Sequence, residues 1–450
     1  MPFNLSHQHT AYSKVAMLAL FTIFILGLVL RLQAVTLTEV DTPVRADALK
    51  YVLYAYNMSN FGIYTDSEAG IQGHPEHLKP NALVTPGYPV FLSLFIGDSF
   101  SDNQLYKVLL TQAILSALVI VFAYILFAEL GWMWALFAAL CVAFSPHLVS
   151  ASTYLLTETL FCFFLIAFLA ASSRLKITTN QWLFFAAGLL LGLATLTRPW
   201  TQLFIILLLV MLITSLDQKR ISRSVWAFLG FVCVMIPWFV RNYLVLGMAT
   251  DPSLSVYSIQ HGMYPDMMYN FMPESLGFPY RYDPWVQDAV ISSQTVLDEL
   301  YRRIQANPWI YLEWYSIGKL QTVFSWSILA GMGDVFIYPI VKTPYATSSF
   351  FQLTHMFIYT LHNSFVMLSL IATVFAWLPL AKRVIPTAFL FTFRLLSLLM
   401  IYFMILHMIG APFPRYSIPM RPVIYGLAIV MLAACWNYLK ILYQQRKANL

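Results

Sequence analysis

Residues 16–34 read AMLALFTIFILGLVLRLQA, a stretch whose length and apolar character suit a helix that crosses a bilayer. Of all residues, 60% are hydrophobic and only 10% are charged, whereas a soluble chain carries about a quarter charged residues. The sequence therefore predicts an all-α polytopic membrane protein with about ten transmembrane helices, and it excludes a single core surrounded by water. The other apolar runs lie at roughly 106–128, 131–149, 152–172, 180–197, 200–215, 224–246, 354–380, 386–410 and 418–439.

The first run is longer than the core of a signal peptide and lacks a small-residue cleavage site, so we interpret it as a retained helix. All four cysteines lie inside apolar runs and form neither a disulfide framework nor a CxxC metal pair, which is typical of packing residues. The net charge of +6 is small and follows the membrane topology, so it does not argue for a nucleic-acid partner. The cysteines are Cys141, Cys162, Cys233 and Cys435.

Basic residues in the short loops indicate the orientation, because such residues gather on the cytoplasmic side. With ten spans, four clusters fall on one side, and both termini lie inside. Two long polar segments, about 35–105 and 248–353, then lie outside, in a chain that forms a single transmembrane domain over residues 1–450. The clusters are Arg174 and Lys176; Lys219, Arg220 and Arg223; Lys382 and Arg383; and Lys440, Arg446 and Lys447.

Both outer segments contain helical patterns that are too short or too polar to span, which favours helices lying at the membrane interface. Residues 297–326, LDELYRRIQANPWIYLEWYSIGKLQTVFSW, mix aromatic and basic residues at near-helical spacing. We expect an interfacial helix pair there that is broken before Pro308.

A carboxylate stands out in the first outer segment, where residues 47–62 read DALKYVLYAYNMSNFG. Asp47, Tyr51 and Ala55 recur every four positions and share one helix face. A carboxylate at a helix start can cap the free backbone N–H groups. At the outer face of a membrane it can also serve as a general base. Composition leaves both interpretations open.

Six motifs occur in an order that resembles the glycosyltransferase family 39, or protein mannosyltransferase-like, group. The resemblance covers most of the chain. The motifs are an Asp-x-x-x-Tyr-x-x-x-Ala pattern that closes at Gly62; the element TPGYPVFLSLF at 85–95; LLTETLFCFFL at 155–165; GLLLGLATLTRPW at 188–200; IPWFVRNYLVLG at 236–247; and PRYSIPMRPVIYG at 414–426.

The resemblance implies a GT-C fold and a hexosyl- or pentosyltransferase that takes its sugar from a polyprenyl-phosphate donor. The acceptor would be a protein, lipid or glycan, and the active site of a bacterial inner-membrane enzyme would face the periplasm. Asp47 would be the catalytic base. The residues implied in substrate binding are Tyr51, Tyr88, Glu158, Arg198, Arg241, Arg415 and Tyr416.

Elementary chemistry is consistent with these roles but leaves alternatives. Glu158 in an apolar run is either paired with an arginine or protonated to hold helices together, or it forms a wall of the outer cavity. Arginines at outer helix ends either snorkel or bind phosphate in bidentate fashion. Charges that gather at one face favour an enzyme over a transporter or flippase, whose pathway needs ionisable residues at mid-membrane. A ligase for a whole lipid-linked glycan is the other rival.

The cluster His74, Glu76 and His77 contains plausible zinc ligands. Because the usual i, i+4 spacing of a helical metal site is missing, we expect no metal centre and no certain cofactor, and a divalent cation stays the minor alternative.

Overall fold

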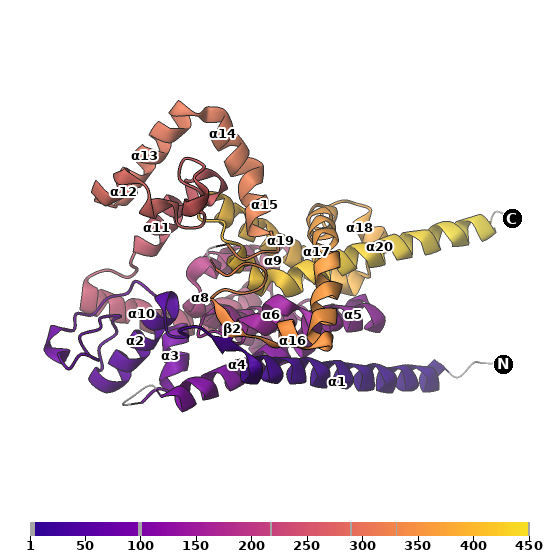
Figure 1. Ribbon diagram of the computed structural model, residues 1–450. Helices are drawn as coiled ribbons and strands as arrows, with labels where there is room; N and C mark the ends of the chain where they lie inside the picture. Colours follow the sequence, from indigo (N-terminus) through magenta and orange to yellow (C-terminus); the bar gives the residue numbers. More distant parts are fainter. Residues whose placement is uncertain (1–4, 98–100, 217, 289, 330, 449–450) are drawn as a thin grey trace.

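The computed structural model describes residues 5–97, 101–216, 218–288, 290–329 and 331–448, and within them the chain is built almost entirely of helices. Ten apolar helices form the body (Figure 1). Six of these are long and apolar enough to cross a membrane: α1 (Leu5–Leu37), α4 (Asp102–Phe127), α10 (Arg220–Leu246), α17 (Ser349–Phe375), α19 (Thr387–Ile409) and α20 (Arg421–Ala448). Four are shorter: α5 (Trp132–Phe144), α7 (Glu158–Ser172), α8 (Gln181–Thr197) and α9 (Phe204–Ser215).

The all-α polytopic prediction is confirmed, but two of the short helices are shorter than the apolar runs that predicted them. Helix α5 ends at Phe144, because Pro146 starts the separate short helix α6 (Pro146–Ala151). Helix α7 begins only at Glu158, after irregular residues 152–157. Glu158 therefore occupies the first turn of its helix, where the helix dipole favours a carboxylate.

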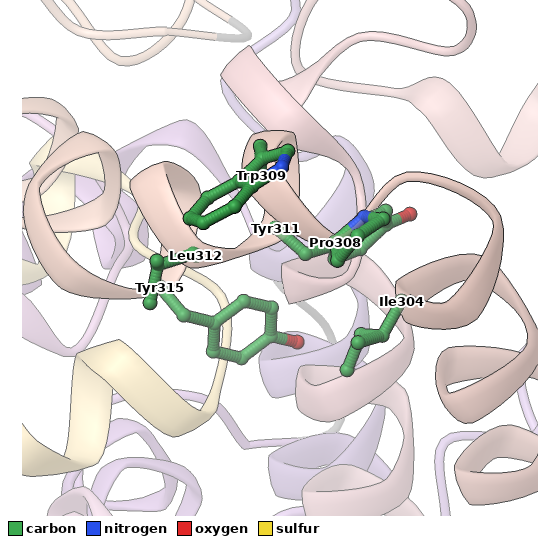
Figure 2. Close-up of a pocket in the computed structure, with 6 residues that line it drawn as sticks. All are labelled: Ile304, Pro308, Trp309, Tyr311, Leu312 and Tyr315. Carbon is green, nitrogen blue, oxygen red and sulfur yellow. The ribbon is translucent and has the colours of Figure 1, made fainter.

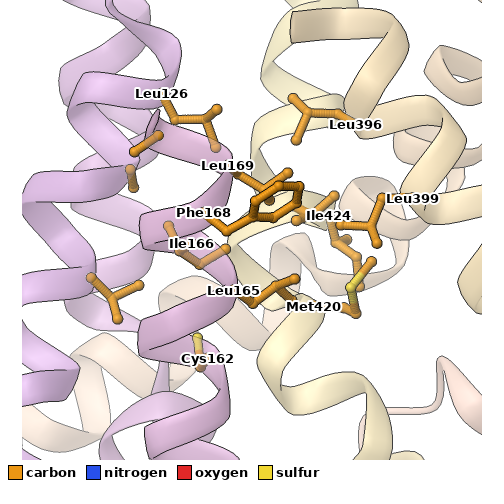
Figure 3. Packing of buried hydrophobic residues seen from close by; sticks show 14 of the residues in the cluster. Leu126, Cys162, Leu165, Ile166, Phe168, Leu169, Leu396, Leu399, Met420 and Ile424 are labelled. Atoms are coloured by element: carbon orange, nitrogen blue, oxygen red, sulfur yellow. The ribbon is translucent and has the colours of Figure 1, made fainter. Parts of the chain in front are cut away.

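The core lies where α7 packs against α4 on one side and against α19 and α20 on the other (Figure 3). Leu126, Leu165, Phe168 and Leu396 are fully buried at this junction. The tight packing fixes the positions of the helix ends, and the candidate functional residues lie at those ends.

The first outer segment contains two helices and one short strand: β1 (Glu39–Val40), α2 (Ala46–Phe61), the single turn η1 (Pro75–His77) and α3 (Gly87–Ser93). Gly62 ends α2 in the left-handed conformation, with φ of +67°, and its N–H bonds to the carbonyl of Met58. That conformation explains why the stretch beginning at Asp47 closes on a glycine.

The second outer segment joins α10 to α17 through short helices and turns. Its strand β2 pairs antiparallel with β1, so the two outer segments are connected. Helices α13 and α14 are separated at Asn307, as predicted from Pro308, and with α12 and α15 they form an arch beside the body (Figure 1). The elements are α11 (Ser253–Gly262), η4 (Pro265–Met267), η5 (Pro273–Ser275), η6 (Pro279–Arg281), α12 (Pro284–Asp288), α13 (Ser293–Ala306), α14 (Pro308–Glu313), η7 (Trp314–Gly318), α15 (Lys319–Val323), β2 (Ile340–Lys342) and α16 (Pro344–Thr347).

Four remaining short elements connect the spans. They are η2 (Ala128–Leu130), η3 (Pro199–Thr201), α18 (Ala381–Val384) and η8 (Pro414–Met420).

Candidate active site

Four charged side chains from distant parts of the chain meet in one network, which we call the charge cluster: Asp47, Glu158, Arg198 and Arg415. Asp47 lies in the first turn of α2, Glu158 in the first turn of α7, Arg198 at the end of α8 and Arg415 in η8. With two carboxylates and two guanidinium groups, the cluster is neutral as a whole.

Asp47 forms an ion pair with Arg415, whose Nη2 donates to its Oδ2. The cap position of α2 belongs to Arg45, and no side chain caps the helix. The interpretation of Asp47 as a helix cap is therefore wrong. Burial raises the pKa of the Asp47 carboxyl, but Arg415, with help from Lys50 and Arg198, lowers it more, so the net pKa lies below its usual value. The side chain remains 36% exposed, which leaves it accessible.

The hydroxyl of Tyr338 fixes the start of α2. It donates to the carbonyl of Arg45 at 3.2 Å and accepts from the N–H of Ala48 at 3.4 Å. These bonds flank Asp47 on both sides along the backbone. Tyr338 belongs to the second outer segment, almost three hundred residues away, and no signal in the sequence pointed to it.

Glu158 and Arg198 form a buried ion pair at 2.7 Å, with the Glu158 side chain only 1% exposed. Arg198 also donates from Nε to the hydroxyl of Thr157 at 2.8 Å, so the pair Thr157-Glu158 holds one guanidinium with two adjacent side chains. Among the described residues, neither Oε2 of Glu158 nor Nη1 of Arg198 has a hydrogen-bond partner. Buried polar atoms without partners are costly, and they mark a place where a polar ligand can bind.

Arg415 connects the two ion pairs. Its Nε lies 3.8 Å from Oε1 of Glu158 while its Nη2 holds Asp47. The Tyr416 ring faces both arginines, 5.2 Å from the guanidinium carbon of Arg198 and 5.7 Å from that of Arg415. A ring in this position holds two cations near each other, since its π face attracts both.

Tyr51 and Tyr88 form an aromatic wall next to the charge cluster. Their ring centroids are 5.2 Å apart in an edge-to-face arrangement, and the fully buried Tyr88 donates its hydroxyl to Gln112 at 2.7 Å. Burial raises the pKa of Tyr51, and so does the negative charge of Asp47, which keeps the phenol protonated.

Gly87 explains the Pro-Gly-Tyr-Pro element. A Cβ at this position would lie 2.6 Å from the carbonyl oxygen of Leu196, closer than real Cβ contacts. The start of α3 can therefore pack directly on the backbone that leads into Arg198. Only glycine allows this approach, and the approach sets Tyr88 close to the charge cluster.

Arg241 lies apart from the charge cluster. Its Nη1 donates to the carbonyl of Asn81 at 2.8 Å and its Nη2 to that of Tyr64 at 3.3 Å. Its guanidinium also covers the rings of Tyr64 and Trp238. Of the predicted site residues, Arg241 is thus the one that the fold uses to hold the first outer segment.

A histidine that the sequence pattern did not single out lies near Asp47. The His261 ring stacks on Tyr280, with centroids 4.2 Å apart and planes 11° from parallel, and it meets Phe413 edge-on. Burial lowers its pKa to about 4, an effect that the charge of Asp47 only partly offsets. At neutral pH His261 is therefore an uncharged imidazole on an aromatic platform.

An apolar pocket of about 420 Å³ lies in the arch, away from these charges (Figure 2). The Trp309 indole at its edge is 79% exposed. No member of the charge cluster contributes to its lining, so the pocket suits an apolar group and not a phosphate. It is lined by Ile304, Pro308, Trp309, Tyr311, Leu312 and Tyr315.

Comparisons with known proteins agree with the fold and with part of the sequence resemblance. Residues 84–242 match the family described as dolichyl-phosphate-mannose-protein mannosyltransferase. No curated protein matches the chain in sequence.

Among solved structures, the archaeal oligosaccharyltransferase AglB from Archaeoglobus fulgidus, in complex with an inhibitory peptide and a dolichol-phosphate, superposes over 97% of this chain with a TM-score of 0.53 and 13% identity. The same enzyme in its apo form superposes over 96% of this chain with a TM-score of 0.51 and 14% identity. This chain covers 52% of the archaeal enzyme, about half its length. The chain is an integral membrane protein with the GT-C fold, similar over residues 84–242 to the dolichyl-phosphate-mannose-protein mannosyltransferases.

Proposed function

We propose that this protein transfers a single sugar from a polyprenyl-phosphate donor to an acceptor nucleophile, with Asp47 as general base. The observation that carries the proposal is the charge cluster, in which an accessible carboxylate lies against two arginines at helix ends. The match of residues 84–242 to a family named for a lipid-phosphate sugar donor supports the same donor class. The acceptor, a protein, lipid or glycan, enters from the exposed side of Asp47.

Arg415 and Arg198 supply the phosphate contacts in this proposal. A guanidinium binds phosphate oxygens through two parallel hydrogen bonds, and Nη1 of Arg198 has no partner among the described residues. Positive charge aimed at the departing phosphate is usually the largest catalytic contribution in such reactions. Tyr416, between the two arginines, keeps both available to one phosphate.

Donor binding would also activate the base. A phosphate that draws Arg415 toward itself weakens the ion pair with Asp47, and the pKa of the carboxyl then rises toward its usual value. Asp47 accepts the proton of the acceptor hydroxyl while the oxygen attacks the anomeric carbon. The bond from that carbon to the phosphate oxygen breaks, the lipid phosphate leaves with the electron pair, and the anomeric configuration is inverted.

Replacing Arg415 by Ala is expected to weaken the binding of undecaprenyl phosphate by about 10- to 100-fold, because a charge-assisted hydrogen bond contributes roughly 1.5–3 kcal/mol. Arg241→Ala is the matched control, since Arg241 bonds to backbone carbonyls of the first outer segment. It should keep donor affinity within a few-fold. Titration of the purified variants in detergent measures both. Equal losses in the two variants, or none in the first, would contradict the assignment of Arg415.

The site would face the periplasm of a bacterial inner membrane, because the short-loop basic clusters favour the opposite, cytoplasmic side. In a background with the exposed Cys233 and Cys435 replaced by Ser, Val290→Cys should react with an impermeant maleimide in intact spheroplasts. Gln218→Cys should react only after the membrane is permeabilised. Val290 is 83% exposed and Gln218 is also at the surface, so access is set by the membrane. The reverse labelling pattern would refute this orientation.

A further inference from the structure

The exposed tip of the first outer segment gathers three side chains that ligate metals. Glu76 lies between His74 and His77 in the single turn η1, and Pro75 starts that turn. The carboxylate Oε1 of Glu76 is 3.3 Å from Nδ1 of His74 and 3.6 Å from Nε2 of His77. One donor atom from each of the three residues lies within 4.8 Å of the other two.

These distances suit a tetrahedral metal ion. Zinc binds imidazole nitrogen and carboxylate oxygen at about 2.0–2.1 Å, so neighbouring donors in a tetrahedron are about 3.3 Å apart. Two edges of the His74–Glu76–His77 triangle already have nearly that length. The third closes by rotation of side chains that are 60–70% exposed or slightly more, according to their exposed fractions of 62%, 61% and 72%.

The bland alternative is a surface ion pair, but the surroundings argue against it as the reason for the arrangement. An exposed pair of this kind contributes about 0–1 kcal/mol, too little to hold two imidazoles on one oxygen atom. The rings of His74 and His77 contact each other, and within the described residues neither ring packs against another aromatic group. Core packing therefore does not force the three donors together.

The tip is also the part of the segment that lacks other anchors. Arg241 and Asn57 hold the backbone near residues 64–67, and Arg241 also holds Asn81. The bonds of the described residues between 69 and 78 are local, such as those from His74 to Ala69 and from His77 to His74. A metal at this point would close the turn and order the whole tip.

We propose that His74, Glu76 and His77 bind one divalent transition-metal ion of the zinc type, with the fourth position open to water. The site is structural and separate from the charge cluster, because none of its members contacts Asp47, Glu158, Arg198 or Arg415 within the described residues. It sits on the outer segment that carries α2, so it orders the loop past which an acceptor approaches.

The test is metal binding by the full-length protein in detergent, purified without a polyhistidine tag. His7 and His9 are replaced by Ala in every form, since a His-x-His pair can bind metal independently. Co²⁺ serves as the optical probe, because tetrahedral Co²⁺ with nitrogen and oxygen ligands absorbs strongly in the visible range. Zn²⁺ should displace it, and the displacement gives the zinc affinity.

We expect one equivalent of Co²⁺ per chain with tetrahedral absorption. His74→Ala combined with His77→Ala should weaken binding by about 100-fold or more, because even groups that only support a ligand change metal affinity 10- to 100-fold. The matched control is Glu68→Gln, an exposed carboxylate of the same loop that bonds to Gln72 instead of the cluster, and it should bind normally. No tetrahedral absorption, or equal binding by the double variant, would overturn the proposal. Neither outcome bears on sugar transfer, because the readout is binding alone.

Discussion

Asp47→Asn lowers sugar transfer by about a hundredfold or more while the protein keeps its fold, if Asp47 is the general base. Asn has nearly the same size and accepts a hydrogen bond from Arg415, but it cannot take a proton at neutral pH. Because Asp47 does not cap α2, the substitution removes no cap and should leave the helix intact. Transfer from a lipid-phosphate sugar is measured with purified protein, and release of the lipid phosphate distinguishes transfer from transport.

The matched control is Asp41→Asn. Asp41 is an exposed carboxylate of the same outer segment, and its side chain accepts a hydrogen bond from the neighbouring Thr42 at 3.2 Å. It should keep normal activity. Full activity in the Asp47 variant at a matched melting temperature, or loss only in the Asp41 variant, would remove Asp47 from the reaction. A loss confined to donor affinity would instead assign Asp47 to the orientation of Arg415.

The pH profile offers a second readout of the same experiment. The pKa of Asp47 is lowered in the folded protein, so its stabilising contribution is present above the unfolded carboxyl value of about 3.9 and is lost as pH falls through the native pKa. The acid limb of kcat/KM should therefore lie below about pH 4 in the wild type. In Arg415→Ala this limb should move to higher pH, because the main charge that lowers the pKa is gone.

Arg198→Ala should destabilise the protein by about 3 kcal/mol or more, because it leaves the carboxylate of Glu158 buried without its partner. The double variant Glu158→Gln and Arg198→Gln should recover most of that loss, since no lone charge remains. It should nevertheless stay inactive if the guanidinium binds the donor phosphate. Unfolding in detergent and sugar transfer, measured on the same preparations, separate the structural from the functional contribution.

Arg174→Ala is the control for this experiment. It breaks the ion pair with Glu129, in which the two side chains are 36% and 29% exposed. Such a partly exposed pair should contribute less than about 1 kcal/mol. If Arg198→Ala is no more destabilising than Arg174→Ala, the buried pair does not hold the helix ends together.

The sequence predicted the fold class well because a bilayer imposes a strong and local signal. Long apolar runs identify spanning helices without knowledge of their neighbours. It was less accurate at helix ends. The run 152–172 contains irregular residues before Glu158, and hydropathy alone does not distinguish buried irregular backbone from helix.

The candidate site was recognisable only as a set of motifs, not as a geometry. Asp47, Glu158, Arg198 and Arg415 carry the resemblance, but nothing local indicates which carboxylate pairs with which arginine. Those pairs depend on tertiary packing. For the same reason, Tyr338, His261 and the loop-anchoring contacts of Arg241 could not be predicted: each depends on backbone brought from another part of the chain.

The ion pair between Asp47 and Arg415 also has a consequence for biogenesis. The two residues are 368 positions apart, whereas Glu158 and Arg198 are separated by 40. A ribosome that adds about 5–20 residues per second therefore delivers Arg415 roughly 20–70 s after Asp47. During that interval Glu158 has already gained its partner, while Asp47 waits at the membrane surface with its carboxylate unneutralised. The active centre is thus the last part of the molecule to be assembled, and a nascent chain can insert nearly all its helices before it has any chemistry to perform.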